Sequence, residues 1–130
     1  SSGESCIAGS RLFVHRGIYD AFMARLADAA AKLRVGDPAD ERTQMGPLIH
    51  EQHRQTVERY VQLGRDEGAT VRVGGARPAG ALYDRGTYYL PTILEGLDNR
   101  AKVVQEEIFG PVLVAMPFDD EEALVAQAND

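Results

Sequence analysis

Hydrophobic and polar positions follow two periods along the chain, and these predict strands and helices in turn. Residues 11–15 carry the apolar run Leu-Phe-Val, which is typical of a buried strand. From position 18 onward, apolar residues recur at steps of three and four, which predicts an amphipathic helix ending before Gly36. The stripe that this period predicts to be buried consists of Ile18, Phe22, Leu26, Ala29 and Leu33.

A second helix is predicted to open at Gly46-Pro47, because proline is favoured in a first helical turn, and to stop at Gly68. One side of this helix is predicted to face the core and consists of Ile49, Val57, Tyr60, Val61 and Gly64. The other side can face water and consists of Glu51, Arg54, Glu58 and Arg65.

The remaining pattern favours strands joined by loops. Residues 69–73 alternate as a strand does, and a loop rich in Gly, Ala and Pro follows from Gly74-Gly75 to about Gly86. Residues 88–94 suit a strand that bends at Pro91 or lies at an edge, whereas the five apolar residues 112–116 suit a strand covered on both faces. Asp119 and Asp120 then cap a last helix. This order predicts an α/β fold with a mostly parallel sheet and helices packed on it, in one unit.

Composition and charge narrow the class of protein. A chain of 130 residues with 44% hydrophobic and 26% charged residues has the make-up of an ordinary globular domain. Its net charge of −6 argues against nucleic acid as a partner, and no apolar run is long enough for a transmembrane helix. One cysteine and no signal peptide favour a cytoplasmic protein. Because the chain begins with Ser1 and stops within the pattern of its last helix, we expect a fragment.

The single cysteine, Cys6, lies among small and polar residues in the segment Gly-Glu-Ser-Cys-Ile-Ala-Gly-Ser-Arg, residues 3–11. Considered alone, a lone cysteine is more often a small buried hydrophobic residue than a nucleophile. These small neighbours, however, leave room for a substrate, and free backbone N–H groups in a tight turn would lower the pKa of a thiol. Both readings stay open on this segment alone.

The segment around Cys6 resembles the cysteine signature of the aldehyde dehydrogenase superfamily. Residues 106–112, Glu-Glu-Ile-Phe-Gly-Pro-Val, are similar to a second motif of that family, about a hundred positions after the cysteine. Residues 45–49 and 89–94 also resemble family segments, so the likeness extends over essentially the whole chain. It implies a three-layer α/β catalytic domain, of which residues 1–130 form a part without the cofactor-binding domain or the C-terminal end.

The resemblance implies oxidation of a small aldehyde to a carboxylic acid with NAD or NADP. Cys6 is then the nucleophile that forms a thiohemiacetal and a thioester, and its backbone N–H contributes to the oxyanion hole. Glu107 would bind the hydroxyls of the nicotinamide ribose and Phe109 would lie beside the nicotinamide ring. Ser5 and Ile7 flank the nucleophile and are candidates for the substrate pocket. Without the family, Glu107 is simply a loop acid and Phe109 a core residue.

Two further residues are less determined by the resemblance. His53 occupies a position near the cofactor in the family, although a histidine on the surface of a helix explains it equally well. With His50 it lacks the spacing of a zinc-protease motif and a third ligand, so we predict no metal. Glu4 stands where the family commonly has glutamine. Its carboxylate either raises the thiol pKa by facing the sulfur or points away and bonds to backbone.

The general base, the second oxyanion donor and most cofactor contacts of the family lie on earlier segments. We therefore expect this chain alone to be inactive, and its parent to be a homodimer or homotetramer, as members of the family usually are. Two alternatives remain: a catalytically silent binding or structural homologue, and a relative that passes the thioester to coenzyme A.

Overall fold

The computed structural model describes residues 2–130. Their elements, in chain order, are β1 (Arg11–His15), the 3-10 turn η1 (Arg16–Ile18), α1 (Tyr19–Ala31), α2 (Glu51–Asp66), β2 (Thr70–Val73), β3 (Thr92–Glu95), α3 (Lys102–Gln105), β4 (Val112–Phe118) and α4 (Glu121–Ala128).

The four strands form one sheet in the order β1-β4-β3-β2. β4 pairs in parallel with both β1 and β3, whereas β2 pairs antiparallel to β3. The prediction of a mostly parallel sheet is confirmed. β4 lies between β1 and β3. Its apolar residues are covered on both faces, as the run at 112–116 predicted, and Val112, Val114, Ala115 and Met116 are all buried.

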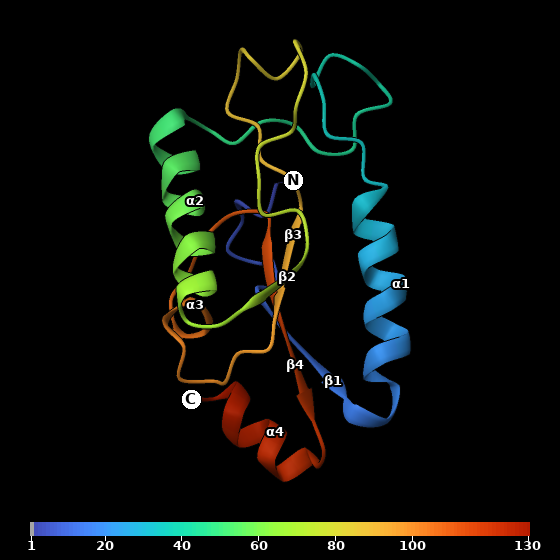
Figure 1. Cartoon of the computed structure of the whole chain (residues 1–130), viewed down its shortest axis with the longest axis vertical. Coiled ribbons are helices and arrows are strands. Elements are labelled where there is room, and N and C mark those ends of the chain that lie inside the picture. Colours follow the sequence, from blue (N-terminus) through green and yellow to red (C-terminus); the bar gives the residue numbers. More distant parts are fainter. Residues whose placement is uncertain (1) are drawn as a thin grey trace.

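Helices cover the two faces of this sheet and complete three layers (Figure 1). On one face α2 and α3 pack Val57, Val61 and Val103 against Leu94 and Val114. On the other face α1 packs against the sheet in a second cluster, which contains Val14, Met23, Ile93 and Ala115. Successive residues of β4 point to opposite faces, so that Val114 joins the first cluster and Ala115 the second. The three-layer α/β fold is confirmed.

Pro91 and Pro111 directly precede β3 and β4, whereas Pro117 lies within β4 and does not end it. Within the predicted strand 88–94, regular pairing begins only at Thr92, directly after Pro91, because proline offers no N–H to a ladder. β3 is nevertheless an inner strand, since β2 pairs along its other side. β4 continues beyond the predicted residue 116 through Pro117 to Phe118.

The helix predicted from position 18 is confirmed as α1, whereas its predicted buried stripe is right for Leu26 and wrong for Ile18, Phe22, Ala29 and Leu33. Met23 is fully buried, and Tyr19, Leu26 and Ala30 pack beside it. Phe22 and Leu33 are each 40% exposed and Ile18 is 58% exposed. Because α1 is rich in alanine, its sequence carries two overlapping apolar stripes, and only contact with the sheet decides which is covered.

The second helix begins later than predicted, at Glu51 instead of Gly46-Pro47. His50 is its N-cap: the backbone there is extended and Nδ1 accepts a hydrogen bond from the N–H of His53 at 3.0 Å. Residues 46–49 are held from outside the helix, where the N–H of Leu48 donates to the carbonyl of Thr87 at 3.0 Å. Ile49, predicted to be buried, is 77% exposed.

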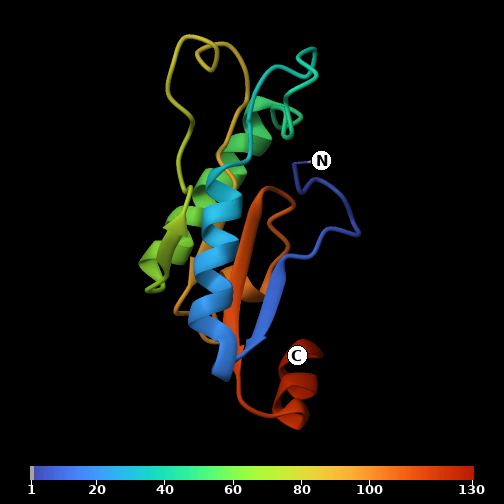
Figure 2. The ribbon, with the colours of Figure 1, turned by 90° about the vertical axis from the view of Figure 1, so that its right-hand side faces the viewer.

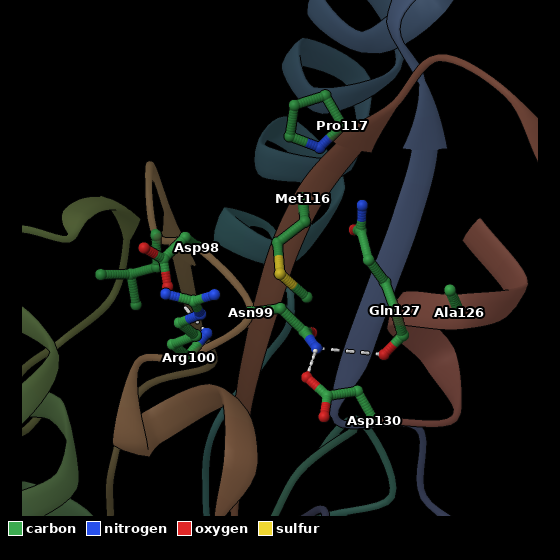
Figure 3. A pocket seen from close by; sticks show the side chains of 9 residues that line it. Asp98, Asn99, Arg100, Met116, Pro117, Ala126, Gln127 and Asp130 are labelled. Carbon is green, nitrogen blue, oxygen red and sulfur yellow. Dashed lines mark hydrogen bonds between the residues drawn. The ribbon is translucent and has the colours of Figure 1, made fainter. Parts of the chain in front are cut away.

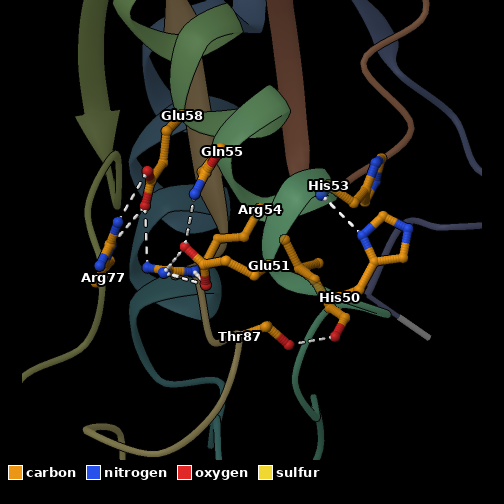
Figure 4. A network of polar contacts seen from close by, with 9 residues as sticks. His50, Glu51, His53, Arg54, Gln55, Glu58, Arg77 and Thr87 are labelled. Carbon is orange, nitrogen blue, oxygen red and sulfur yellow. Dashed lines mark hydrogen bonds and ion pairs between the residues drawn. The ribbon is translucent and has the colours of Figure 1, made fainter.

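Arg54, predicted to face water, is 5% exposed. Its guanidinium lies between the carboxylates of Glu51 and Glu58, and Glu58 also accepts from Arg77 of the following loop (Figure 4). A buried arginine requires such partners, because an unpaired charge in the interior is costly. The pairing ties the loop after β2 to α2.

The prediction that an aspartate caps the last helix is confirmed for Asp120, whose Oδ1 accepts from the N–H of Ala123 at 2.8 Å. Asp119 instead pairs with Arg16 at 2.7 Å. Among the helices formed by residues 2–130, none combines the length and the apolar character needed to cross a membrane.

Candidate functional site

Two loops meet at the amino ends of neighbouring parallel strands. Residues 2–10, here called the Cys6 loop, lead into β1, and residues 106–111, here called the Glu107 loop, lead into β4. Because β1 and β4 are parallel, with Arg11 opposite Val114, both loops reach the sheet at the same end (Figure 2). Segments a hundred positions apart in sequence are thereby placed together.

Cys6 lies at the exposed tip of its loop, as a free thiol. The N–H of Ala8 donates to the carbonyl of Ser5 at 2.9 Å, which closes a tight turn with Cys6 and Ile7 at its centre. Ser5 is half-buried, and Ile7 is 96% exposed. The thiol is therefore accessible and is not one of the core residues.

The Glu107 loop faces the Cys6 loop across a narrow cleft, which is lined by Ser5 and Ala8 on one side and by Glu107 and Phe109 on the other. Glu107 is exposed. The carboxylate of the neighbouring Glu106 accepts a hydrogen bond from the hydroxyl of Tyr60 at 2.9 Å. This bond raises the pKa of the Tyr60 phenol above its ordinary value. The exposed carboxylate of Glu107 is therefore the one of the two that can contact a ligand at the cleft.

Glycines permit the close approach of the two loops. Gly3 has φ +78, and a Cβ at this position would lie 2.2 Å from the carbonyl oxygen of Gly110. A Cβ on Gly110 would in turn lie 2.7 Å from a methyl group of Val57 in α2. The backbone of Gly3 therefore packs against the Glu107 loop, and this loop packs against α2. A side chain at Gly3 or Gly110 would push these segments apart.

Phe109 has an unusual backbone conformation, with φ +56, which residues other than glycine rarely adopt. Its carbonyl oxygen is 2.6 Å from Nε2 of His53, and the two rings meet edge to face at 6.3 Å. Its side chain is half-buried. The first turn of α2 and the Glu107 loop are thus joined directly at the site.

Glu4 points toward the start of α2 and accepts a hydrogen bond from the backbone there. This is the second of the two expectations for Glu4, in which its carboxylate bonds to backbone. Its Oε1 accepts from the N–H of Ile49 at 3.1 Å and lies 3.5 Å from Nε2 of His53. Its Oε2 accepts from the hydroxyl of Ser2 at 2.7 Å. The side chains of Glu4 and His53 are only 15% and 18% exposed. These contacts give the carboxylate partners other than the thiol.

A larger cleft lies elsewhere, between α4, the end of β4 and the loop after β3 (Figure 3). Met116 and Pro117 contribute to its wall, and Asn99 donates to the carbonyl of Gln127 at 3.2 Å and to Asp130 at 2.8 Å. None of the residues predicted from the sequence to act in catalysis or binding lines this cleft. Within residues 2–130, no three side chains of His, Cys, Asp and Glu are grouped as metal ligands would be.

Of the predicted site residues, Ser5, Cys6, Glu107, Phe109 and His53 are brought to one end of the sheet, with Ile7 at its exposed margin. Sequence reasoning missed the contact between Gly3 and Gly110 and the positive φ of Phe109. The glycine three residues before the cysteine was a signal for the first; nothing in the local sequence indicated the second.

The sequence model of the aldehyde dehydrogenase family matches residues 1–130. Betaine aldehyde dehydrogenases of Brucella anthropi and Brucella ovis are each 42% identical to the chain over all 130 residues, which correspond to 27% of each relative. The chain thus spans about a quarter of the length of the curated relatives it matches.

Solved structures agree. A betaine aldehyde dehydrogenase of Staphylococcus aureus in complex with NAD+ is 39% identical, with a TM-score of 0.97 over 99% of this chain and 26% of that one. An aldehyde dehydrogenase of Bacillus cereus is 37% identical, with a TM-score of 0.94 over the same shares of the two chains.

Proposed function

Since this chain belongs to the aldehyde dehydrogenase family, we propose that it is part of the catalytic domain of a longer enzyme that oxidises an aldehyde to a carboxylic acid with NAD or NADP. The observation that carries the proposal is that the exposed Cys6 thiol and the exposed Glu107 carboxylate belong to two loops that face one another across one cleft, which Glu107 lines on one side and Ser5 and Ala8, on either side of Cys6 in the sequence, line on the other. Neither side chain is needed for the core, so both are available for chemistry.

Cys6 is the proposed nucleophile. Its thiolate adds to the carbonyl carbon of the aldehyde, a C–S bond forms, and the oxygen becomes the alkoxide of a tetrahedral thiohemiacetal. The backbone N–H of Cys6 is the proposed donor to that oxygen. When the carbonyl re-forms, the carbon loses its hydrogen with the electron pair and Cys6 carries a thioester, which water hydrolyses to the acid and the free thiol. The general base for this water lies on a segment outside the chain.

The residues of the Glu107 loop suit a dinucleotide in their chemistry. A carboxylate has only acceptors, so Glu107 can accept from two neighbouring ribose hydroxyls, and it is exposed at the cleft. Phe109 supplies an aromatic side chain beside it, and His53 contacts Phe109 from α2. When bound, the dinucleotide supplies the acceptor for the hydride. The relative solved in complex with NAD+ makes NAD the first cofactor to test.

The proposed substrate is a small aldehyde, and Ser5 and Ile7 are the proposed walls of its pocket next to the nucleophile. Relatives named for betaine aldehyde, at 42% identity, make that compound the first to assay. The cytoplasmic location and the homodimeric or homotetrameric state of the longer enzyme remain predictions.

The test uses the longer enzyme with betaine aldehyde and NAD+, and follows NADH by absorbance. The wild type is expected to form NADH, and Cys6→Ser to reduce the rate by at least about a thousandfold, as for loss of a catalytic nucleophile. Acid as the product supports hydrolysis, whereas product that forms only with added coenzyme A supports the acylating alternative. No turnover together with cofactor binding would support a silent homologue. The 130-residue chain by itself is expected to form no NADH.

A further inference from the structure

Three segments of the chain meet at one ring nitrogen, Nε2 of His53, which lies close to the carbonyl oxygen of Phe109 and to the carboxylate of Glu4. The oxygen belongs to Phe109 in the Glu107 loop, the group that contacts it is Nε2 of His53 in α2, and the same nitrogen lies 3.5 Å from Oε1 of Glu4 in the Cys6 loop. Phe109 and His53 are proposed functional residues, and Glu4 lies two residues before Cys6.

A contact of 2.6 Å between Nε2 and a carbonyl oxygen requires a hydrogen on the nitrogen, because the oxygen can only accept. Glu4 favours the same arrangement, since its carboxylate also has acceptors only and lies beside Nε2. A glutamine at position 4 could turn its amide N–H toward the ring and would no longer select this tautomer. The acid at position 4 therefore favours the same position of the ring hydrogen as the Phe109 carbonyl does.

Phe109 needs an outside contact to keep its backbone conformation. With φ +56 it occupies a region that bulky side chains leave unless the surroundings hold them there. The surroundings here are the donor of His53 on the carbonyl and the packing of the next residue, Gly110, between Val57 and Gly3. Loss of the donor would leave the packing alone to hold the loop.

We propose that Glu4 and His53 form a positioning pair that holds the Phe109 carbonyl and thereby fixes Glu107 and Phe109 relative to Cys6. In this account His53 serves the cofactor through Phe109 and does not have to touch it. The effect on turnover rests on the proposed function, whereas the effect on the backbone does not.

Hydrogen exchange of the 130-residue chain tests the contact without any reaction. In His53→Leu, the amides of residues 107–111 are expected to exchange about 3- to 10-fold faster, as for loss of one buried hydrogen bond. In His53→Gln they are expected to remain within about 2-fold of the wild type, because the amide of glutamine can still donate. His15→Leu is the matched control, since His15 is exposed at the far end of β1, where its side chain accepts from the N–H of Gly17 and its ring contacts that of Phe118.

Faster exchange limited to residues 107–111, with rescue by glutamine, supports the pair. Unchanged exchange in His53→Leu would show that packing alone holds the loop and would overturn the proposal. Equal acceleration in the leucine and glutamine variants would overturn the role of the donor. Faster exchange throughout α2 and the sheet would mean that His53 supports the fold in general, and this too contradicts a positioning pair.

Kinetics of the longer enzyme test the consequence. In His53→Leu and Glu4→Ala, kcat is expected to fall about 3- to 10-fold, as for one misplaced hydrogen bond, and the isotope effect with the 1-deutero aldehyde to rise as hydride transfer becomes slower. The rate at which a thiol reagent labels Cys6 should stay within about 2-fold of the wild type, because the turn at Ser5–Ala8 has its own hydrogen bond.

An unchanged isotope effect in both variants, or a large change in Cys6 labelling, would contradict positioning of the Glu107 loop. If the wild-type enzyme oxidises no aldehyde, the proposed function fails, while hydrogen exchange still decides whether Glu4 and His53 hold Phe109.

Discussion

Replacing Gly3 by alanine perturbs the contact on which the candidate site depends. The added methyl group would lie 2.2 Å from the carbonyl oxygen of Gly110 and 2.6 Å from its carbon. These are backbone atoms, which cannot rotate away as a side chain would. Gly9 provides a matched control in the same loop, because a Cβ there meets nothing within 4 Å.

The expected cost follows from two effects. An alanine held at φ +78 is strained by about 1–2 kcal/mol, the cost of a left-handed conformation for an L-residue. Overpacking against atoms that cannot yield adds about 1–3 kcal/mol. The smaller entropy of an unfolded chain with alanine offsets about 0.4–1 kcal/mol. We therefore expect Gly3→Ala to lower the free energy of unfolding by about 1–5 kcal/mol, and Gly9→Ala to leave it unchanged or raise it by up to about 1 kcal/mol.

Urea unfolding of the 130-residue chain, followed by circular dichroism, measures both changes. If the Cys6 loop moves aside instead of straining the whole fold, the loss of stability is smaller, and the amides of residues 107–111 then exchange faster in Gly3→Ala than in Gly9→Ala. Equal stability of the two variants, together with equal exchange at residues 107–111, would refute the contact between the Cys6 loop and the Glu107 loop.

Three further predictions concern other parts of the chain. Met23→Ala is expected to destabilise the chain by about 2–5 kcal/mol in urea unfolding and Phe22→Ala by less than about 1 kcal/mol, because only Met23 is fully buried; the reverse order would mean that α1 packs by its other stripe. Burial raises the pKa of Tyr89 to about 12, so the neutral phenol stabilises the fold fully below pH 10 and this contribution is lost as the pH rises through about 12. Ultraviolet titration should find one late phenol more in the wild type than in Tyr89→Phe, and equal numbers would contradict the burial. In the longer enzyme, Glu107→Gln is expected to raise KM for NAD+ by about 10-fold or more, as for loss of charge-assisted hydrogen bonds, whereas Glu106→Gln should stay within about 2-fold; equal effects would argue against a specific role for Glu107.

Much of the fold could be predicted because the strands carry their own signals. The apolar runs at 11–15 and 112–116 identified β1 and β4, and the aspartates after them identified the cap of α4. The errors occurred where contacts between side chains, and not the period of the sequence, decide burial or the start of a helix. The alanines of α1 allow two buried stripes, and the carboxylates around Arg54 bury a residue that helical period assigns to water. The start of α2 was misplaced because the side chain of His50 caps the helix, so that the helix begins at Glu51 and not at Gly46-Pro47.

The site was predicted from its motifs, and its geometry was not. Resemblance indicated Cys6 and Glu107, and parallel pairing of β1 with β4 explains why the loops that carry them meet. No local pattern could indicate that Phe109 takes a positive φ or that His53 contacts its carbonyl, because both depend on residues more than fifty positions apart. Glu4 was recognised as a departure from the family, and only the folded chain gives it partners.

The central claim is that Cys6 carries the substrate as a thioester. The most direct measurement mixes the longer enzyme with betaine aldehyde and NAD+, quenches the reaction in acid before the first turnover ends, and determines the mass of the peptide that contains Cys6. The account predicts an acyl group on Cys6 that forms only when both aldehyde and NAD+ are present. NADH formation with Cys6 unmodified throughout, or unaffected by Cys6→Ser, would contradict it.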